Sequence, residues 1–312
     1  MTVLEQVFTA GTFFVVLTKV APILLAALGG AFTQQGNILN IGLEGMMLIG
    51  AFTAIVVGAA VDSALIGVIA AVIAALVLAT IYALATLWFK ADNIVVGIGI
   101  NLLAAGVSIF LLQVIFGNPG ASPAGSKITL PRVSLGPIGD IPFVGAALDN
   151  QTALVWVALL CVPLSSLVLY RTRYGVHLRA VGEDEPAALA AGINVRRVKA
   201  QSILISGLLC GLAGAQLAMA SLGTFTADMT AGRGFIAVAA LTFGLARPLR
   251  TMIAAFIFGA ADAIADLLGI AGFNSSIALM VPYVVTIIAL VFAGIRFRGW
   301  RQLRAVPQSV PA

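Results

Sequence analysis

Long apolar runs make up most of the chain, and short polar segments separate them. The longer runs hold about 20 residues or more, which is enough for a helix to cross roughly 30 Å of hydrocarbon. Two shorter apolar runs, at about 43–61 and 233–246, lie among them. The longer runs cover about 12–33, 63–88, 92–117, 152–170, 200–222, 250–268 and 276–295.

These runs predict helices, because no strand-like alternation is sustained and a spanning segment must satisfy its own backbone hydrogen bonds. The expected fold class is an all-α polytopic membrane protein. We expect one transmembrane domain over 1–312, a bundle of roughly eight to ten helices that includes broken or re-entrant segments.

Composition agrees with a membrane protein and excludes a soluble domain. Hydrophobic residues make up 61% of the chain and charged residues 9%, and the mean hydropathy is +1.11. The net charge of +5 is spread between spans and forms no continuous basic groove, so no nucleic-acid partner is expected. Cys161 and Cys210 lie in apolar runs, without a disulfide framework or metal spacing. The N-terminus shows no cleavable signal peptide.

Positive charge orients the bundle. If the crossings alternate from Lys90 onward, thirteen Lys and Arg residues fall on one side, which is then the cytoplasm. That side holds the loop 171–199, the Arg247–Arg250 turn and the basic tail 296–312, so the C-terminus is expected in the cytoplasm. The loop 118–151 is expected outside. Before Lys90 the parity is open: three segments leave the N-terminus outside, unless 43–61 is re-entrant or 63–88 is broken.

The polar island 171–199 predicts a short, rigid helix. Glu183, Asp184 and Glu185 are acidic N-cap candidates, Pro186 suits the first helical position, and Gly192 suits the end. Such a helix on the cytoplasmic side offers a handle to a soluble partner. The alternative is a loop whose charges only set topology.

Two glycine-rich polar segments, 34–50 and 226–244, occupy similar places in the two halves of the chain. Short interrupted segments in corresponding positions indicate broken helices with a substrate path at their interface. Three polar residues belong to the first segment. Glu44 either caps a broken helix or lines the path, or it pairs with backbone or a basic residue, and Asn37 and Asn40 flank it.

Other polar residues within or near the spans are costly and need partners. Asn101 is expected to face the bundle, where it contacts either substrate or another helix. Lys19 is expected to extend toward the membrane surface. Asp228 and Arg233 are expected to form an ion pair in an outer loop.

Asp262 and Asp266 share one helix face because they are four residues apart. Paired carboxylates in a membrane can relay protons, which would make the chain an ion-coupled secondary transporter. They can equally cap loops near the outer surface.

No catalytic site can be assembled from the sequence, and the chain is not expected to be an enzyme. His177, the single histidine, has no Ser or Cys nucleophile near it. The phosphate-loop spacing of Gly120 and Gly125 fails because Ser126 precedes Lys127 where a glycine–lysine pair is required. We expect no bound cofactor, and ATP, if used, must be hydrolysed by a partner.

Four segments together resemble one family. They are LNIGLEGMMLIGAF at 39–52, DNIVVGIGINLLAAG at 92–106, AVGEDEPAALAAGINV at 180–195 and AGRGFIAVAALTFGLARP at 231–248. The pattern resembles the permease subunits of bacterial ATP-binding-cassette (ABC) importers of the branched-chain amino acid, ribose and nucleoside superfamily. It is most similar to the shorter permease of nucleoside and simple-sugar importers.

The resemblance implies a location and a set of partners. The chain would lie in the bacterial inner membrane with a second permease, either a sister chain or a second copy of itself. A cytoplasmic ATPase would drive it, and an extracytoplasmic binding protein would deliver substrate. The segment 183–193 matches the family's coupling helix, although its Gly-Glu-Asp-Glu-Pro start is unusually acidic. Expected coupling residues are Gly182, Glu183, Asp184, Glu185, Pro186, Ala187, Ala188, Ala191 and Gly192.

A nucleoside is the expected substrate, with a simple sugar or a branched-chain amino acid as alternatives. Such a path needs small residues, amides and occasional aromatics, without a fixed counter-charge. The candidate path residues are Asn37, Asn40, Glu44, Asn101 and Phe235.

Overall fold

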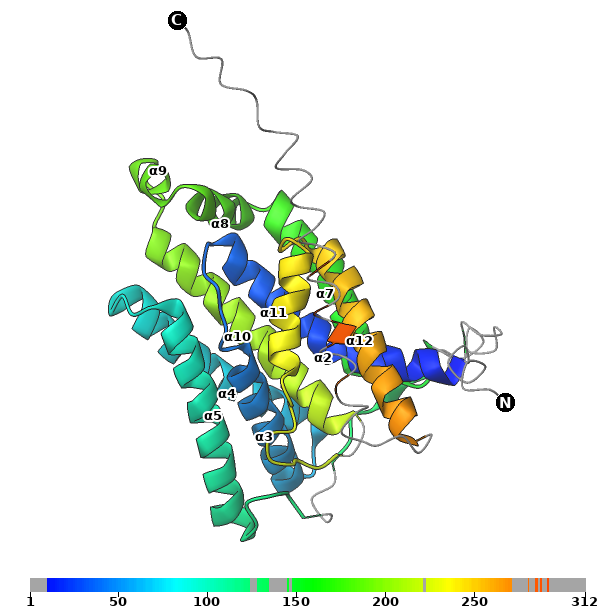
Figure 1. Ribbon diagram of the computed structural model, residues 1–312. Coiled ribbons are helices and arrows are strands. Elements are labelled where there is room, and N and C mark those ends of the chain that lie inside the picture. The colour runs from blue at the N-terminus through cyan, green and yellow to red at the C-terminus, as the bar shows by residue number, and fades with distance from the viewer. Residues whose placement is uncertain are drawn as a thin grey trace, which may run out of the picture.

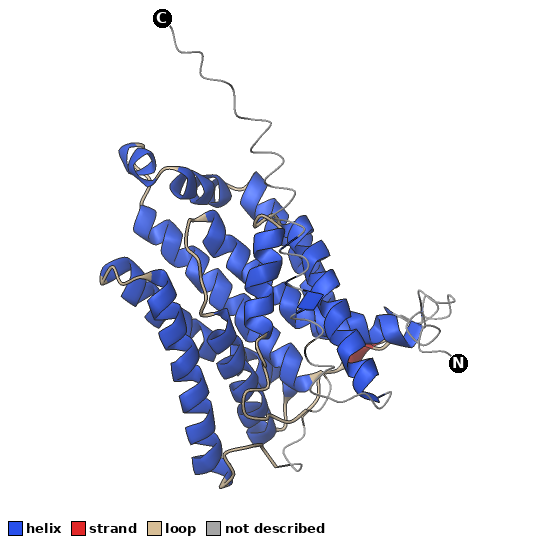
Figure 2. Ribbon diagram, viewed as in Figure 1, coloured by secondary structure: helices blue, strands red, loops and turns tan. Residues whose placement is uncertain are grey.

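The fold is known from a computed structural model, which describes residues 10–123, 128–134, 148–220 and 223–270 and a few single residues elsewhere. Helices account for nearly all of the described chain (Figure 2). Seven of the described helices are long and apolar enough to cross a membrane. The prediction of an all-α membrane bundle is therefore confirmed. The predicted span 276–295 lies outside the described residues, apart from a few single positions.

The helices follow the apolar runs closely. Asp92 caps α5 by accepting from the N–H groups of Ile94 and Val95, and Gly117 ends that helix in the left-handed region. The bounds are α2 (Ala10–Gln35), α3 (Leu43–Val61), α4 (Ala64–Ala83), the π-helix η1 (Leu84–Trp88), α5 (Asn93–Phe116), α7 (Ala153–Arg171), α8 (Arg173–Glu183), α9 (Glu185–Ala190), α10 (Val195–Met219), α11 (Arg233–Phe243) and α12 (Pro248–Ile270).

Helix α10 lies at the centre of the bundle and packs on α2, α3 and α4 (Figure 1). Glycines allow the close approach: a Cβ on Gly214 would lie 2.2 Å from the carbonyl oxygen of Met47, and one on Gly211 would lie 2.7 Å from the Cα of Val72. Close backbone packing through small residues is the usual way in which helices associate in lipid. The core is therefore held by α10 rather than by the outer helices.

The cations of three described loops lie at one end of the bundle, which we call the basic end, whereas Arg132 lies at the opposite end. Helices α8 and α9 lie across it (Figure 1). Lys90 lines one cleft with Arg196 and Lys199, and Arg179 lines another with Ala246. The three cation-bearing loops therefore meet, as alternating crossings predict.

At the opposite end lie the described residues 117–123, 128–134, 149–152 and 223–232, and backbone hydrogen bonds link several of them. Strand β1 (Arg132–Val133) pairs antiparallel with β2 (Gln151–Thr152), and Ala121 forms a bridge with Thr226. The short amphipathic piece expected within 118–151 falls largely outside the described residues. Helix α2 begins at this end and α3 ends there, so α3 runs outward from inside the bundle. Three of the described membrane-length helices precede Lys90.

Candidate translocation and coupling site

The N-termini of two helices meet inside the bundle, and Glu44 lies between them. Helix α2 reaches the basic end, after which residues 36–42 lead back into the bundle to the start of α3 (Figure 1). Helix α11 has 11 residues, about 16 Å at 1.5 Å per residue, so it spans only about half of the hydrocarbon. Glu44 lies in the first turn of α3 and caps the start of α11. Its Oε1 accepts from Gly232 N–H at 2.8 Å and its Oε2 from Gly234 N–H at 2.5 Å.

Glycines at 232 and 234 make this contact possible. Gly232, the N-cap of α11, has φ +78°, in the left-handed region that favours glycine. A Cβ on Gly234 would lie 2.5 Å from both the Cα and the backbone nitrogen of Glu44. The start of α11 can therefore approach the carboxylate only because both positions lack a side chain. Of the alternatives for Glu44, the structure shows it bonded to backbone, where it caps the start of α11.

Two asparagines satisfy the remaining backbone groups of the break. Asn40 Oδ1 accepts from Gly42 N–H at 2.9 Å, and its Nδ2 donates to Ser206 Oγ at 3.2 Å. Asn101 Oδ1 accepts from Gly45 N–H at 2.8 Å, and its Nδ2 donates to Ile41 C=O at 3.1 Å. Orphan groups at a helix start inside a membrane need such partners. Of the two alternatives for Asn101, the structure shows the contact with another helix.

Asn37 and Phe235 lie away from this contact. Asn37, at φ +59°, lines a polar cleft of about 360 Å³ at the basic end, together with Gln35, Arg179 and Glu183. Phe235 is 49% exposed on α11. The candidate path residues therefore separate into three at the break, of which Asn40 and Glu44 are buried and Asn101 is half-buried, and two exposed positions.

A network of four charges holds α11 against α2 and α12. Arg233 donates to both carboxylate oxygens of Asp262, at 2.9 Å to Oδ2. Lys19 Nζ lies 2.5 Å from Asp266 Oδ2 and 3.7 Å from Asp262 Oδ2. The predicted pairing of Arg233 with Asp228 is wrong, because Arg233 opens α11 and its side chain points to α12 instead.

The expectation for Lys19 is also wrong, and the two aspartates do not act alone. Lys19 binds the carboxylates of α12 within the bundle rather than extending to the membrane surface. Two cations and two carboxylates balance in charge, and Asp262 is only 5% exposed. The geometry therefore favours a structural network over a proton relay.

The segment 183–193 holds one short helix, as predicted, but Glu183 is not part of it. Glu183 is the last residue of α8, and Asp184 both ends α8 and starts α9. Asp184 Oδ1 accepts from Ala187 N–H at 3.0 Å, and Pro186 lies in the first turn. A single residue therefore joins the two helices, which leaves little freedom between them.

Helix α9 ends in a Schellman motif. Gly192, at φ +80°, donates its N–H to Leu189 C=O, and Ile193 N–H donates to Ala188 C=O at 3.0 Å. Ala191 N–H donates to Ala187 C=O. The backbone is thus satisfied at both ends of α9, and the helix is a rigid unit despite its length of 6 residues.

Helix α8 packs directly on the break after α2. A Cβ on Gly182 would lie 2.1 Å from the carbonyl oxygen of Gln35 and 3.4 Å from the nitrogen of Asn37. Leu178, fully buried on the same helix, contacts Gly36. Helix α8 is therefore in backbone contact with the segment that leads to Glu44.

Sequence reasoning missed the contact of Gly234 with Glu44 and the ion pairs of Lys19 and Arg233 with α12. The signal was present in part, since an intramembrane lysine needs a carboxylate partner and Asp262 and Asp266 were available. The close approach of Gly234 to α3 leaves no mark in the sequence beyond the glycine itself.

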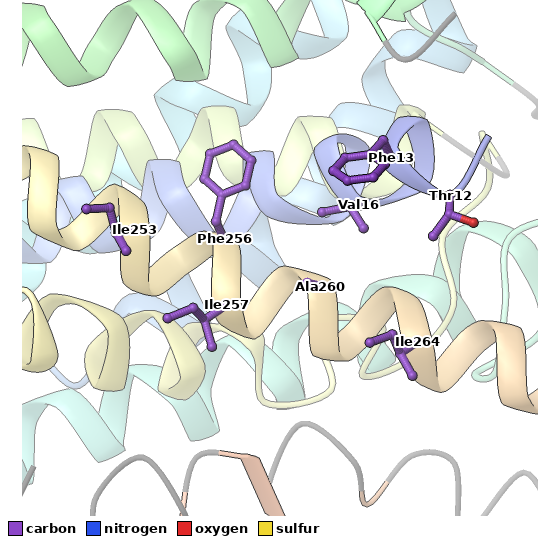
Figure 3. Close-up of a pocket in the computed structure, with 8 residues that line it drawn as sticks. All are labelled: Thr12, Phe13, Val16, Ile253, Phe256, Ile257, Ala260 and Ile264. Carbon is purple, nitrogen blue, oxygen red and sulfur yellow. The ribbon is translucent and has the colours of Figure 1, made fainter. Parts of the chain in front are cut away.

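An apolar groove between α2 and α12 does not suit a polar substrate (Figure 3). It has a volume of about 440 Å³. Thr12 supplies its only polar side chain, and the other lining residues are Phe13, Val16, Ile253, Phe256, Ile257, Ala260 and Ile264. A polar ligand would lose its hydrogen bonds with water there.

Replacing Glu44 tests the meeting of the helix ends. In Glu44→Leu the N–H groups of Gly232 and Gly234 lose a charged acceptor, a loss of about 1.5–3 kcal/mol per hydrogen bond. We expect a clearly lower melting temperature of the purified protein, with Glu44→Gln in between. Glu183→Leu, on the exposed end of α8, is the control for stability, and equal melting of the two leucine variants would contradict the role of Glu44.

A double replacement separates a structural network from a proton relay. Asp262→Asn alone leaves the buried guanidinium of Arg233 without its carboxylate, at about 3–5 kcal/mol, and Arg233→Gln alone leaves Asp262 only the longer contact with Lys19. We expect the double variant Arg233→Gln/Asp262→Asn to regain much of the stability and transport lost in each single variant. A relay requires the opposite result, in which every variant that lacks Asp262 is inactive in transport assays however stable it is.

Comparison with known proteins identifies the family to which this chain belongs. A family model described as the permease component of the branched-chain amino acid transport system matches residues 12–290. The chain is 36% identical to the nucleoside ABC transporter permease NupC of Lactococcus lactis, over 86% of this chain and 87% of the relative. It is 35% identical to the guanosine ABC transporter permease NupQ of Bacillus subtilis, over 88% and 89%.

A third relative, TsgC13 of Haloferax volcanii, is provisionally named a glucose ABC transporter permease. It is 31% identical over 97% of each chain. Matches of this length cover the break, the buried Glu44 and the α8–α9 corner together. The chain therefore belongs to the family of permease components of the branched-chain amino acid transport system, and it is a multi-pass membrane transport protein.

Proposed function

We propose that this chain is the permease subunit of an ATP-driven ABC importer and forms the path for nucleosides. The observation that carries the proposal is its likeness, over most of its length, to NupC and NupQ, whose names state nucleoside and guanosine transport. The resemblance found in the sequence at 39–52, 92–106, 180–195 and 231–248 supports the same conclusion.

The charged side chains inside the bundle, those of Glu44 and of the four-charge network, support an uncharged substrate. Helix N-termini attract anions, and in other transporters half-helix ends of this kind bind anionic groups of the substrate. Here Glu44, in the first turn of α3, already binds the start of α11. Lys19, Arg233, Asp262 and Asp266 are paired with one another. A neutral nucleoside needs no fixed counter-charge, whereas an amino acid zwitterion needs two.

A simple sugar is the second candidate. TsgC13 supports it, since its provisional name states glucose, and a sugar is also polar and uncharged. The same charge argument disfavours a branched-chain amino acid, although the family carries that description.

The energy for transport would come from a partner ATPase that binds α9. In this proposal the basic end faces the cytoplasm, as does the C-terminus, and the chain itself binds no cofactor and catalyses no reaction. A second permease subunit and an extracytoplasmic binding protein complete the importer. The rigid ends of α9 and its position at the basic end support the coupling role.

The contact of α8 with the break gives the coupling a physical route. ATP closure of the ATPases would displace α9, and the single-residue joint at Asp184 would carry α8 with it. Because Gly182 touches Gln35 backbone to backbone, α8 cannot move toward α2 without shifting residues 36–42. That shift would reach Glu44 and the start of α11, and packed helices respond to such shifts by switching between discrete arrangements.

Uptake by the reconstituted importer tests the function. We expect nucleoside uptake that requires ATP and continues after the proton gradient is dissipated, because the paired carboxylates Asp262 and Asp266 are already held by Lys19 and Arg233. Excess glucose should leave nucleoside uptake unchanged, and excess unlabelled guanosine should suppress it. Uptake that stops with the proton gradient while ATP is present would contradict an ATP-driven importer.

Two replacements at Gly192 test the rigidity of α9. Valine seldom adopts the left-handed backbone, at a cost of about 1–2 kcal/mol, while asparagine tolerates it. A Cβ at this position meets nothing within 4 Å, so the two variants differ in backbone strain alone. We expect Gly192→Val to lower transport per ATP hydrolysed several-fold and Gly192→Asn to stay near the native ratio. Equal ratios in the two variants would count against α9 as a rigid lever.

A further inference from the structure

A cleft of about 770 Å³ opens at the basic end beside α9, and two distant parts of the chain form its walls. One wall comes from η1 and the turn after it, with Leu87 and Lys90. The other comes from α9 and the start of α10, with Leu189 and Arg196. We call this the cytoplasmic cleft. It separates the α4–α5 hairpin from the proposed coupling helix.

The cytoplasmic cleft has an excess of positive charge. Lys90, Arg196 and Lys199 line it with a single acid, Glu185. Lys199 Nζ lies 2.6 Å from Glu185 Oε2, so these two charges compensate each other. Within the described ranges, neither Lys90 nor Arg196 forms an ion pair. Both are exposed, and an anionic partner would complete the arrangement.

An apolar side chain lies beside these cations. Leu189 is 56% exposed, whereas its neighbour Ala188 is buried. A single exposed leucine is ordinary, but this one lines a concave site that also holds Leu87 and two unpaired cations. Protein partners bind such sites with an apolar anchor surrounded by charged and polar contacts.

The backbone that forms the other wall of the cytoplasmic cleft, at η1 and Lys90, has an unusual conformation. Helix α4 widens into the π-helix η1, where Phe89 N–H donates to Leu84 C=O at 3.2 Å and Ala91 N–H to Ala85 C=O at 3.0 Å. Lys90 then adopts φ +55°, a region that lysine seldom enters. π-Helical turns occur frequently at functional sites. The widened turn brings Lys90 to the cytoplasmic cleft.

We propose that the cytoplasmic cleft is a second docking site for the ATPase subunit and receives an acidic segment that carries one apolar side chain. The proposal rests on the proposed function, because docking of the ATPase on α9 brings the ATPase next to the cleft. The acidic groups pair with Lys90 and Arg196, and the apolar group packs on Leu189 and Leu87.

This site extends the reach of the ATPase to the other half of the bundle. The hairpin that carries Lys90 continues into α5, whose Asn101 holds the start of α3. An ATPase segment seated in the cleft would therefore move α5 together with α9. Helix α8 contacts the break at Gly182, and α5 contacts it at Asn101. Both contacts would therefore respond to the same ATPase.

Charge reversal in the full importer complex tests the proposal. We expect Lys90→Glu and Arg196→Glu each to lower the amount of ATPase retained on the purified permease about tenfold, as for loss of a close interfacial charge pair. Arg250→Glu is the matched control, because Arg250 is exposed at the start of α12 and does not line the cleft. It should change retention by less than about twofold.

Comparison with α9 separates failure of this proposal from failure of the proposed function. If Lys90→Glu retains as much ATPase as Arg250→Glu while replacement of 184–192 by a Gly-Ser linker releases the ATPase, the second site is overturned and coupling through α9 stands. If no ATPase co-purifies with the native permease, the proposed function itself fails.

A photo-reactive residue at position 90 provides a measurement that does not depend on the stability of the charge variants. In the purified complex, we expect it to form an adduct with the ATPase subunit, identified by its mass, while the same residue at position 250 forms far less. An adduct with anionic lipid and none with the ATPase would overturn the proposal, because the cleft would then be a headgroup site.

Discussion

The position of the Glu44 carboxylate between two helix N-termini is the constraint on which the rest of the bundle depends. Each helix start carries roughly half a positive charge, so the two ends repel unless an anion lies between them. Glu44 supplies that anion, and its two oxygens satisfy backbone donors at 232 and 234. The break at 36–42, the shortness of α11 and both glycines at its start follow from this arrangement, since each is needed for the ends to meet.

Helix α11 is held at its first turn by two neighbours at once. Glu44 of α3 binds its backbone, and Asp262 of α12 binds its first side chain, Arg233. Any displacement of α11 must therefore carry α3 or α12 with it or break a buried contact. The contact between Gly182 and Gln35 reaches the same region from the basic end. A displacement of α8 therefore acts on α11, which cannot shift without moving α3 or α12 or breaking a buried contact.

Sequence reasoning found what is local and missed what depends on tertiary contacts. The spans, the capped α9 and the glycine-rich break follow from hydropathy and from Asp184, Pro186 and Gly192, whose effects reach only a few residues. The partners of Glu44 lie about 190 residues away, and a buried glutamate can be satisfied in many ways. The pairing of Arg233 with Asp228 was wrong for the same reason: proximity in sequence was taken for proximity in space, but Asp228 lies in a turn at φ +56° while Arg233 begins a helix.

The charge arrangement also bears on where the energy for transport enters. An ion-coupled carrier needs a group that gains and loses its ion during the cycle. In the described bundle the candidates, Asp262 and Asp266, form ion pairs with Lys19 and Arg233. Separating Asp262 from Arg233 would leave a buried charge unpaired, at a cost of several kcal/mol. The network therefore suits holding α11 against α2 and α12 better than exchanging an ion. In the proposed importer the energy enters as displacement, and the well-capped α8–α9 corner at the basic end is the element that we propose receives it.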